Sequence, residues 1–318
     1  MPAGSPAARP GRGRGGRGVV SPRLAELPVP RTGLGEGPCW EPDEGALYWT
    51  DIPAHQVHRL AADGTHTAWD TGQPVGAIVP RAGGGMALAA KDGFWALDTG
   101  RGQLALLAHV EADVPDNRMN DGACDKAGRF FAGTMAEDES PGAGTVYRFD
   151  PDHEVTAVLR DVSISNGIGW SLDESRMYYV DSLAHSVDVF DYDTTSGAIG
   201  NRRVFAAVGG DGVAPDGLAV DADGCVWVAL WGGSALVRYG PDGRLRQTLE
   251  IPAANVTCCA FGGADLATLY ITTAAGPGAG GGALFPAGPG PLACPPTRSG
   301  ADSPTGEAPM PPETDPPR

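Results

Sequence analysis

The chain has 318 residues, of which 48 are Gly and 29 are Pro, and its formal net charge at pH 7 is −16. This acidic balance disfavours a nucleic-acid partner, because binding phosphate requires a basic face. No stretch has the roughly 18 consecutive apolar residues that a membrane-spanning helix needs, so no membrane partner is expected. The length suits one large domain or two small ones.

The two ends of the chain differ from its middle in composition. Residues 1–22 contain an Arg/Gly-rich tract and residues 289–318 are rich in Pro and Gly, so neither end can bury enough apolar surface to offset the entropy cost of ordering. We predict a disordered leader at 1–22, a folded domain at 23–288 and a disordered tail at 289–318. The leader could instead bind nucleic acid, or arise from a start codon placed too far upstream. It lacks the apolar region of a secretory signal.

Six cysteines are spread irregularly along the chain, at Cys39, Cys124, Cys225, Cys258, Cys259 and Cys294. They are too few for a disulfide framework in a chain of this length, and no Cys-x-x-Cys pair is present. We therefore expect no disulfide framework and a cytoplasmic location.

The middle of the chain alternates short apolar runs with turn residues, which is typical of strands joined by tight turns. Runs rich in strand-forming residues lie at 47–50, 130–133, 177–180 and 226–229. A second alternating run follows each of them, for example at 187–192 and 235–239. No amphipathic segment is long enough to predict a helix, so the pattern indicates an all-β domain.

Four segments of the chain share one register, and each begins with an oxygen-bearing side chain. Their leading residues are Glu36, Asn120, Asn166 and Asp216. A turn follows eight or nine positions later, at Gly45, Gly128, Ser175 and Gly224. A large aromatic residue follows eleven or twelve positions later, at Tyr48, Phe131, Tyr178 and Trp227. The segments are therefore interpreted as equivalent strands of equivalent repeats.

Two further segments fit this register, one beginning at Gly76 and the other at Thr257. Six units spaced by roughly 40 to 50 residues have the period of β-propeller blades, which are typically four-stranded antiparallel sheets arranged around a central channel. We therefore predict a six-bladed β-propeller whose innermost strands line the channel. A β-sandwich explains the pattern less well, because it has no reason to place one residue type at the same point of every repeat.

The leading residues of the four segments would meet at one point of such a channel. Asn-Gly and Asp-Gly pairs taken singly are ordinary turn signals, but here a separate turn follows each one, and Glu36 is not a favoured turn residue. Carboxylate and amide oxygens suit Ca²⁺, Mg²⁺ or Mn²⁺, and carboxylates also bind Zn²⁺. We therefore predict a single divalent cation in the central channel. No nucleophile–His–Asp arrangement or phosphate-binding loop is recognisable.

Residues from about 30 to 285 resemble the senescence-marker-protein/gluconolactonase family. The stretches that carry the resemblance include Gly35-Glu36-Gly37-Pro38, Asn117-Arg118-Met119-Asn120-Asp121-Gly122, Phe131-Ala132-Gly133-Thr134-Met135-Ala136-Glu137, Ile164-Ser165-Asn166-Gly167, Tyr179-Val180-Asp181-Ser182, Pro215-Asp216-Gly217 and Thr257-Cys258-Cys259-Ala260-Phe261-Gly262-Gly263. Several motifs occur in order across the whole middle region, so chance similarity is excluded as an explanation. The resemblance implies a six-bladed propeller that holds one divalent cation in its channel.

The resemblance also implies roles for individual residues. The metal ligands would be Glu36, Asn166 and Asp216, and Asp216 would also be the catalytic acid/base. Arg118 and Asn120 would bind substrate hydroxyls, although Arg118 could alternatively form a rim ion pair with Asp116 or Asp121. A further substrate-contacting carboxylate would be Asp138, in a loop that is shorter here than in the family.

These roles predict a metal-dependent hydrolase that opens sugar lactones, with a small-molecule lactone as its partner. The alternatives are a non-catalytic calcium-binding regulator that uses the same ligands, or a promiscuous esterase or organophosphate hydrolase. An intact Arg118 favours the enzyme, because a protein that only binds a cation does not need a residue to orient substrate. We expect a monomer or a weak homo-oligomer.

Overall fold

The computed structural model describes residues 24–277, 279–288 and 298–300. The predicted leader at 1–22 and most of the predicted tail at 289–318 lie outside the described residues. In the described part, strands run from Gly35 to Ala287 and the only helix is a short 3₁₀ turn, η1 (Ser182–Ala184). No helix in these described ranges is long and apolar enough to cross a membrane.

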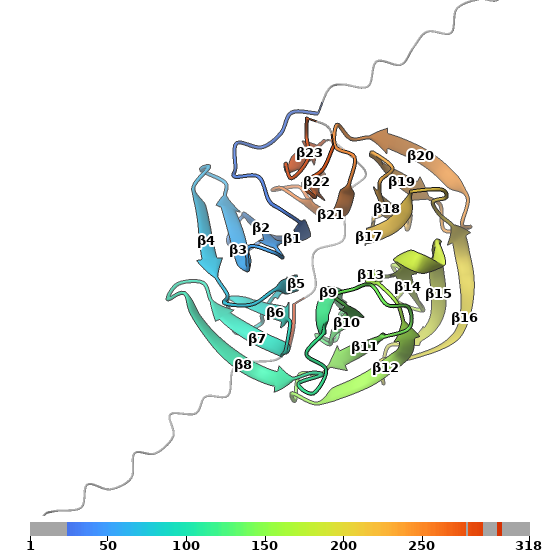
Figure 1. Ribbon diagram of the computed structural model, residues 1–318, viewed down its shortest axis with the longest axis horizontal. Coiled ribbons are helices and arrows are strands. Elements are labelled where there is room, and N and C mark those ends of the chain that lie inside the picture. Colours follow the sequence, from blue (N-terminus) through green and yellow to red (C-terminus); the bar gives the residue numbers. More distant parts are fainter. Residues whose placement is uncertain (1–23, 278, 289–297, 301–318) are drawn as a thin grey trace, which may run out of the picture.

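Six antiparallel sheets surround a central axis, with the first strand of each sheet nearest the centre (Figure 1). Five sheets have four strands, while the sixth has three strands in the described residues. Each sheet is built from consecutive strands of the chain, so each repeat of the sequence forms one blade. The predicted six-bladed β-propeller is therefore confirmed, with one blade shorter than expected.

The strands recur in the same order in every blade. The innermost strands are β1 (Gly35–Glu41), β5 (Val75–Pro80), β9 (Asn117–Cys124), β13 (Ser165–Trp170), β17 (Ala214–Val220) and β21 (Val256–Gly262). The second strands are β2 (Ala46–Asp51), β6 (Met86–Ala90), β10 (Phe130–Ala136), β14 (Arg176–Asp181), β18 (Val226–Trp231) and β22 (Thr268–Thr273). The third strands are β3 (Gln56–Ala61), β7 (Gly93–Asp98), β11 (Gly144–Phe149), β15 (Ser186–Asp193), β19 (Ala235–Tyr239) and β23 (Phe285–Ala287). The outermost strands are β4 (His66–Asp70), β8 (Gln103–His109), β12 (Val155–Val162), β16 (Ala198–Ala207) and β20 (Leu245–Glu250).

All six innermost strands carry an irregularity in their pairing at the level of the predicted ligands. The pairing shifts between Glu36 and Cys39, between Val75 and Ala77, at Asn120, between Ser165 and Ile168, between Pro215 and Leu218, and between Val256 and Cys258. A β-bulge bends its strand and changes the direction of a side chain. Each innermost strand therefore has one pairing irregularity, at the position where the sequence register places the oxygen-bearing residues.

Small residues let neighbouring innermost strands approach one another closely. A Cβ on Gly76 in β5 would lie 2.6 Å from the carbonyl oxygens of both Met119 and Asn120 in β9. A Cβ on Gly217 in β17 would lie 2.3 Å from the Cys258 sulfur in β21. These contacts are too short for any side chain, so glycine at these positions keeps the channel narrow.

The hydrophobic core lies between adjacent blades rather than at the channel axis. Between blades 2 and 3, the Phe94 ring stacks on Phe149 with centroids 4.7 Å apart and meets Phe130 edge-on at 5.4 Å. All three rings are fully buried. Packing of this kind fixes the angle between blades and so fixes where the innermost strands point.

The two ends of the propeller meet at blade 6. The segment before β1 runs along this blade, where the Leu27 amide donates to the Leu284 carbonyl at 2.8 Å and the Thr32 amide donates to the Gly282 carbonyl at 2.9 Å. Leu34 also forms an antiparallel bridge with Ala274. The ring is therefore closed by chain segments from both ends of the domain.

Residues 298–300 contact blades 1, 2 and 3. The Arg298 guanidinium bonds to the carboxylates of Glu41 and Asp43, the latter at 2.6 Å. The Ser299 amide donates to the Pro80 carbonyl, and the Gly300 amide donates to the Gly128 carbonyl, each at 2.8 Å. Part of the predicted tail therefore packs on the domain.

His58 on β3 provides a pH-dependent contribution to stability. Its side chain is 4% exposed, stacks on Trp49, and places its Nδ1 3.1 Å from Nε2 of His66. Burial, together with the neighbouring His66, lowers the pKa of His58 to about 4. The unfolded chain therefore binds more protons than the folded protein between this value and the ordinary pKa of about 6.5.

We expect the free energy of unfolding to fall as the pH drops from 6.5 to 4, because up to one proton is taken up at His58 on unfolding. His58→Gln should flatten this part of the stability curve. Urea denaturation at a series of pH values measures the slope. His109→Gln, at an exposed position of β8, is the matched control. Parallel curves for the wild type and His58→Gln would contradict the assignment.

Candidate active site

A cavity of about 230 Å³ lies at the end of the channel where the innermost strands begin. Its polar lining comes from blade 1 (Glu36), blade 3 (Arg118, Asn120 and Glu139), blade 4 (Asn166 and Ser182) and blade 5 (Asp216). Leu34, Met135, Ile164, Leu183, Ala214 and Trp231 complete it. Glu36 and Asp216, which are 180 positions apart in the sequence, therefore line one cavity, as the common register predicts.

The three predicted metal ligands are deeply buried in this cavity. Glu36 and Asn166 are each 3% exposed, and Asp216 is 5% exposed. The Asn166 amide nitrogen donates to the Ser182 hydroxyl at 2.9 Å. The Asn166 Oδ1 is buried and has no hydrogen-bond partner among the described residues. A buried carbonyl oxygen without a partner is costly unless a ligand satisfies it.

Two aspartates brace the loops that lead into the ligand-bearing strands. The Asp51 carboxylate accepts hydrogen bonds from the amides of Gly33 and Leu34, just before Glu36. Asp181 does the same for Ser163 and Ile164, just before Asn166. In blades 1 and 4, the second strand thus holds the segment that leads into the first strand in place.

Buried negative charge accumulates at the floor of the cavity. Burial raises the pKa of Glu36 well above its ordinary value, and repulsion from Asp216 and Asp121 raises it further. Burial likewise raises the pKa of Asp216, again with repulsion from Asp121, while hydrogen bonds from the Gly217 amide and the Asn166 side chain act in the opposite direction. A cation bound here would remove this repulsion and favour the ionised carboxylates.

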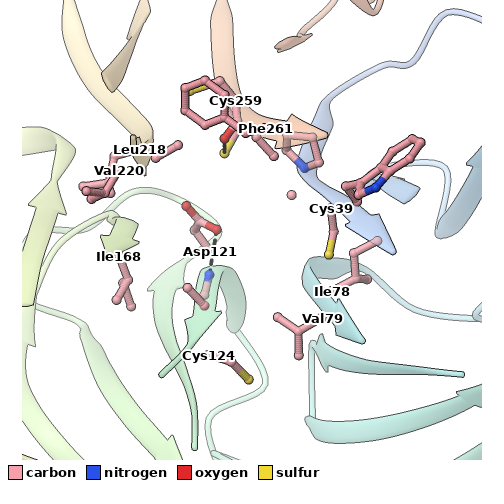
Figure 2. A pocket seen from close by; sticks show the side chains of 18 residues that line it. Cys39, Ile78, Val79, Asp121, Cys124, Ile168, Leu218, Val220, Cys259 and Phe261 are labelled. Carbon is pink, nitrogen blue, oxygen red and sulfur yellow. Dashed lines mark hydrogen bonds between the residues drawn. The ribbon is translucent and has the colours of Figure 1, made fainter. Parts of the chain in front are cut away.

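Asp121 is a functional candidate that the sequence reasoning did not assign. It follows Asn120 on β9, is 4% exposed, and accepts one hydrogen bond, from the Gly122 amide at 2.6 Å. Its side chain lines a second cavity, formed by the later residues of the innermost strands and therefore further along the channel (Figure 2). Burial raises the pKa of Asp121 to about 7. Because it interacts electrostatically with Glu36 and Asp216, it adds negative potential beneath the ligand layer.

Arg118 and Asn120 form a connected pair on blade 3. An Arg118 guanidinium nitrogen donates to the Asn120 side-chain oxygen at 2.7 Å and to the Met119 carbonyl at 3.1 Å. The Asn120 amide donates to the Ser165 carbonyl at 2.8 Å. Arg118 forms no ion pair with Asp116 or Asp121, so the alternative rim role has no counterpart within the residues described. Its remaining donors are available to a ligand in the cavity.

The loop after β10 places the acidic residues Asp138 and Glu139 differently. Asp138 is exposed, accepts a hydrogen bond from the Ser140 amide at 3.0 Å, and does not line the cavity. Glu139 adopts a left-handed conformation with φ of 60° and does line it. The cavity lining therefore includes Glu139 and not the predicted Asp138. Assignment of Asp138 as a substrate contact stays a prediction, with no geometric support.

The donor set fits a hard divalent cation. Within the described ranges, no three His, Cys, Asp or Glu side chains come together as a metal-binding group. The site therefore depends on an amide oxygen together with two carboxylates, which are ligands that Ca²⁺ and Mg²⁺ accept. The unpartnered Asn166 oxygen and the mutually repelling carboxylates are the features that such an ion would satisfy.

Comparison with known proteins agrees with this architecture. Residues 34–275 match the model of the SMP-30/gluconolactonase/LRE-like region. The chain belongs to the SMP-30/gluconolactonase family. The predicted family membership is therefore confirmed, and the matched region begins just before β1 and ends just after β22.

Relatives in this family include the regucalcins. Regucalcin from Gallus gallus is 40% identical over 248 residues, which cover 76% of this chain and 83% of the relative. Regucalcin from Homo sapiens is 40% identical over 247 residues, with the same coverage. A solved structure of a calcium-binding protein, regucalcin, from Agrobacterium tumefaciens matches with a TM-score of 0.83 and 30% identity, covering 87% of this chain and 98% of that one.

Proposed function

We propose that this SMP-30/gluconolactonase family member is a divalent-metal-dependent hydrolase that opens aldonolactones, such as gluconolactone, to aldonic acids. The observation that carries the proposal is the buried Oδ1 of Asn166, which has no hydrogen-bond partner among the described residues and lines the same cavity as two buried carboxylates and Arg118. The oxygens suit a cation, and the arginine suits a hydroxylated substrate. The family description, which includes gluconolactonases, supports the same reading.

Glu36, Asn166 and Asp216 would hold the cation. When bound, it would supply Lewis-acid polarisation of the lactone carbonyl, which is typically worth several kcal/mol of transition-state stabilisation. The ion is Ca²⁺, Zn²⁺, Mg²⁺ or Mn²⁺, and the amide ligand favours the harder ions among these.

Asp216 is the proposed acid/base residue. It takes a proton from the water that attacks the carbonyl carbon, and returns a proton to the ring oxygen as the carbon–oxygen bond of the lactone breaks. A positioned base contributes roughly 10²–10⁴-fold to the rate. Arg118 stays protonated and can only donate hydrogen bonds, so it orients the sugar hydroxyls together with Asn120.

The volume of the cavity limits the size of the substrate that it can hold. A volume of about 230 Å³ lies below the roughly 300–1,000 Å³ of pockets that bind drug-sized ligands. A single sugar lactone suits a cavity of this size. We propose Glu139, whose loop position lines the cavity, as the further hydroxyl-binding carboxylate in place of Asp138.

The second candidate function is calcium binding without catalysis. It is favoured by the relative from Agrobacterium tumefaciens, which is described as a calcium-binding protein. The hydrogen-bonded Arg118–Asn120 pair favours the enzyme, because neither side chain is needed to hold a cation. The expected cytoplasmic location and the monomeric or weakly associated state stay predictions.

A pH-stat assay on gluconolactone, galactonolactone and xylonolactone, with and without a chelator, tests the proposal. We expect chelator-sensitive release of acid from at least one of the three, above spontaneous hydrolysis. Cation binding with no acid release from any lactone would favour the regulator. Hydrolysis that the chelator does not affect would contradict a metal-dependent mechanism.

Arg118→Ala is expected to raise KM for the lactone by roughly tenfold while changing kcat less, because hydrogen bonds from a charged group contribute about 1.5–3 kcal/mol to binding. Initial rates over a range of lactone concentrations separate the two constants. Arg101→Ala, at an exposed position of blade 2, is the control. An unchanged KM would mean that Arg118 only supports the rim of the cavity.

A further inference from the structure

A second hollow adjoins the candidate active site on the side of blades 4 and 5. Its volume is about 700 Å³, and its lining includes His185, Asp211 and Trp231. Trp231 and Ala214 also line the active-site cavity, so the two spaces share a wall. The active-site cavity and this larger hollow therefore adjoin each other at Ala214 and Trp231.

Trp231 has the position expected of a sugar-stacking residue. It ends β18, pairs with Ala214 of β17, and leaves its side chain 39% exposed at the boundary between the two spaces. An indole offers a large apolar face with a polar edge, and such rings recur in small-molecule sites. The apolar face of a sugar ring can pack against it from either side.

Two residues with polar side chains, His185 and Asp211, line the hollow together with this indole. His185 caps η1 in a left-handed conformation with φ of 51°, and its carbonyl accepts a hydrogen bond from the Val208 amide. Reciprocal backbone bonds between Gly210 and Val213, at 3.0 and 2.9 Å, form a tight loop with the exposed Asp211 near its tip. A histidine and an aspartate therefore line the same hollow as Trp231.

We propose that this hollow is a second sugar subsite, and that the enzyme accepts aldonolactones that carry an additional glycosyl ring. The inference rests on the proposed lactonase function and specifies its substrate class. The lactone ring would occupy the cavity beside Asp216, and the attached ring would lie against Trp231 with its hydroxyls near His185 and Asp211.

The chemistry of the hollow favours a sugar over an alkyl substituent. An alkyl chain would remove water from the Asp211 carboxylate and the His185 ring without replacing those hydrogen bonds, which is unfavourable. A glycosyl ring has hydroxyls for both groups and a C–H face for the indole. The separation of one small cavity from one larger hollow also matches a two-ring substrate.

The test compares kcat/KM for gluconolactone with that for two glucosyl-gluconolactones, the 1,4-linked cellobionolactone and the 1,6-linked gentiobionolactone. We expect at least one of the two-ring substrates to equal or exceed gluconolactone. Asp211→Ala and His185→Ala should each lower kcat/KM for that substrate by about three- to tenfold, as expected for one lost hydrogen bond. Both variants should leave gluconolactone turnover within twofold, because neither residue lines the active-site cavity.

Failure of this inference is distinguishable from failure of the proposed function. If gluconolactone is hydrolysed but kcat/KM for both two-ring lactones is more than tenfold lower, the subsite is overturned. It is also overturned if the Asp211 and His185 variants lose kcat/KM equally on one-ring and two-ring substrates. If no lactone is hydrolysed, titration calorimetry with cellobiose tests whether the hollow binds a sugar. Binding by the wild type that is lost in Trp231→Ala supports the subsite, and no binding to the wild type rejects it.

Discussion

Asp216→Asn is expected to lower kcat for gluconolactone by roughly 10²–10⁴-fold, the contribution of a positioned acid/base group. The substitution keeps an oxygen at the same place but removes the ability to accept a proton at working pH. The rate should be measured by pH-stat with the cation in excess, so that weaker binding of the ion does not limit turnover. Asp152→Asn, at an exposed turn of blade 3, is the matched control.

A decrease of less than tenfold in a folded Asp216→Asn protein would contradict the acid/base role. In that case the same variant still reports on the ligand role through its affinity for the cation. Retained kcat with weakened cation binding would assign Asp216 to the metal alone, and would leave proton transfer to water. The pair of measurements therefore separates the two roles proposed for this residue.

Glu36→Gln is expected to change stability in opposite directions with and without a cation. Without a cation, the substitution removes one of the buried, mutually repelling carboxylates, so the variant should unfold at a higher temperature than the wild type. Ca²⁺ at 100 times its Kd should stabilise the wild type by about 2.7 kcal/mol, and the same Ca²⁺ concentration should stabilise the variant much less because it binds the ion more weakly.

Thermal unfolding of the wild type and Glu36→Gln over a series of Ca²⁺ concentrations tests these opposite changes in stability. Glu154→Gln, an exposed change of the same kind on blade 3, should follow the wild type in every condition. A variant that is less stable than the wild type without cation would mean that Glu36 is not under electrostatic strain. An identical Ca²⁺-dependent shift in both proteins would exclude Glu36 as a ligand.

The positions of the ligand layer were predictable because the propeller repeats one register. Glu36, Asn166 and Asp216 stand at equivalent points of three blades, and Gly76 and Thr257 stand at the same point of two others. What the sequence does not reveal is the bulge that accompanies this point in every innermost strand. The bulge sets the direction of each side chain, and it depends on pairing with the second strand.

Asp121 illustrates the limit of this reasoning. At the equivalent positions, the other innermost strands carry Gly37, Ala77, Gly167, Gly217 and Cys258. No repeated pattern marks this layer as functional, and a one-residue irregularity decides which side of the channel Asp121 faces. Its proximity to Glu36 and Asp216 could only be found from coordinates.

The sequence does not distinguish Asp138 from Glu139. The two acidic residues are adjacent, and Glu139, which has a left-handed conformation, lines the cavity while Asp138 does not. The hollow beside Trp231 could not be predicted either, because the register of oxygen-bearing residues marks the innermost strands and not the loops that line this hollow.

A crystal structure with Ca²⁺ bound, with the ion identified by its anomalous signal, tests the central claim most directly. We predict a single ion within about 2.3–2.6 Å of side-chain oxygens of Glu36, Asn166 and Asp216, the usual range for calcium–oxygen contacts. An ion bound elsewhere, or one whose coordination leaves the Asn166 Oδ1 without a partner, would contradict the account.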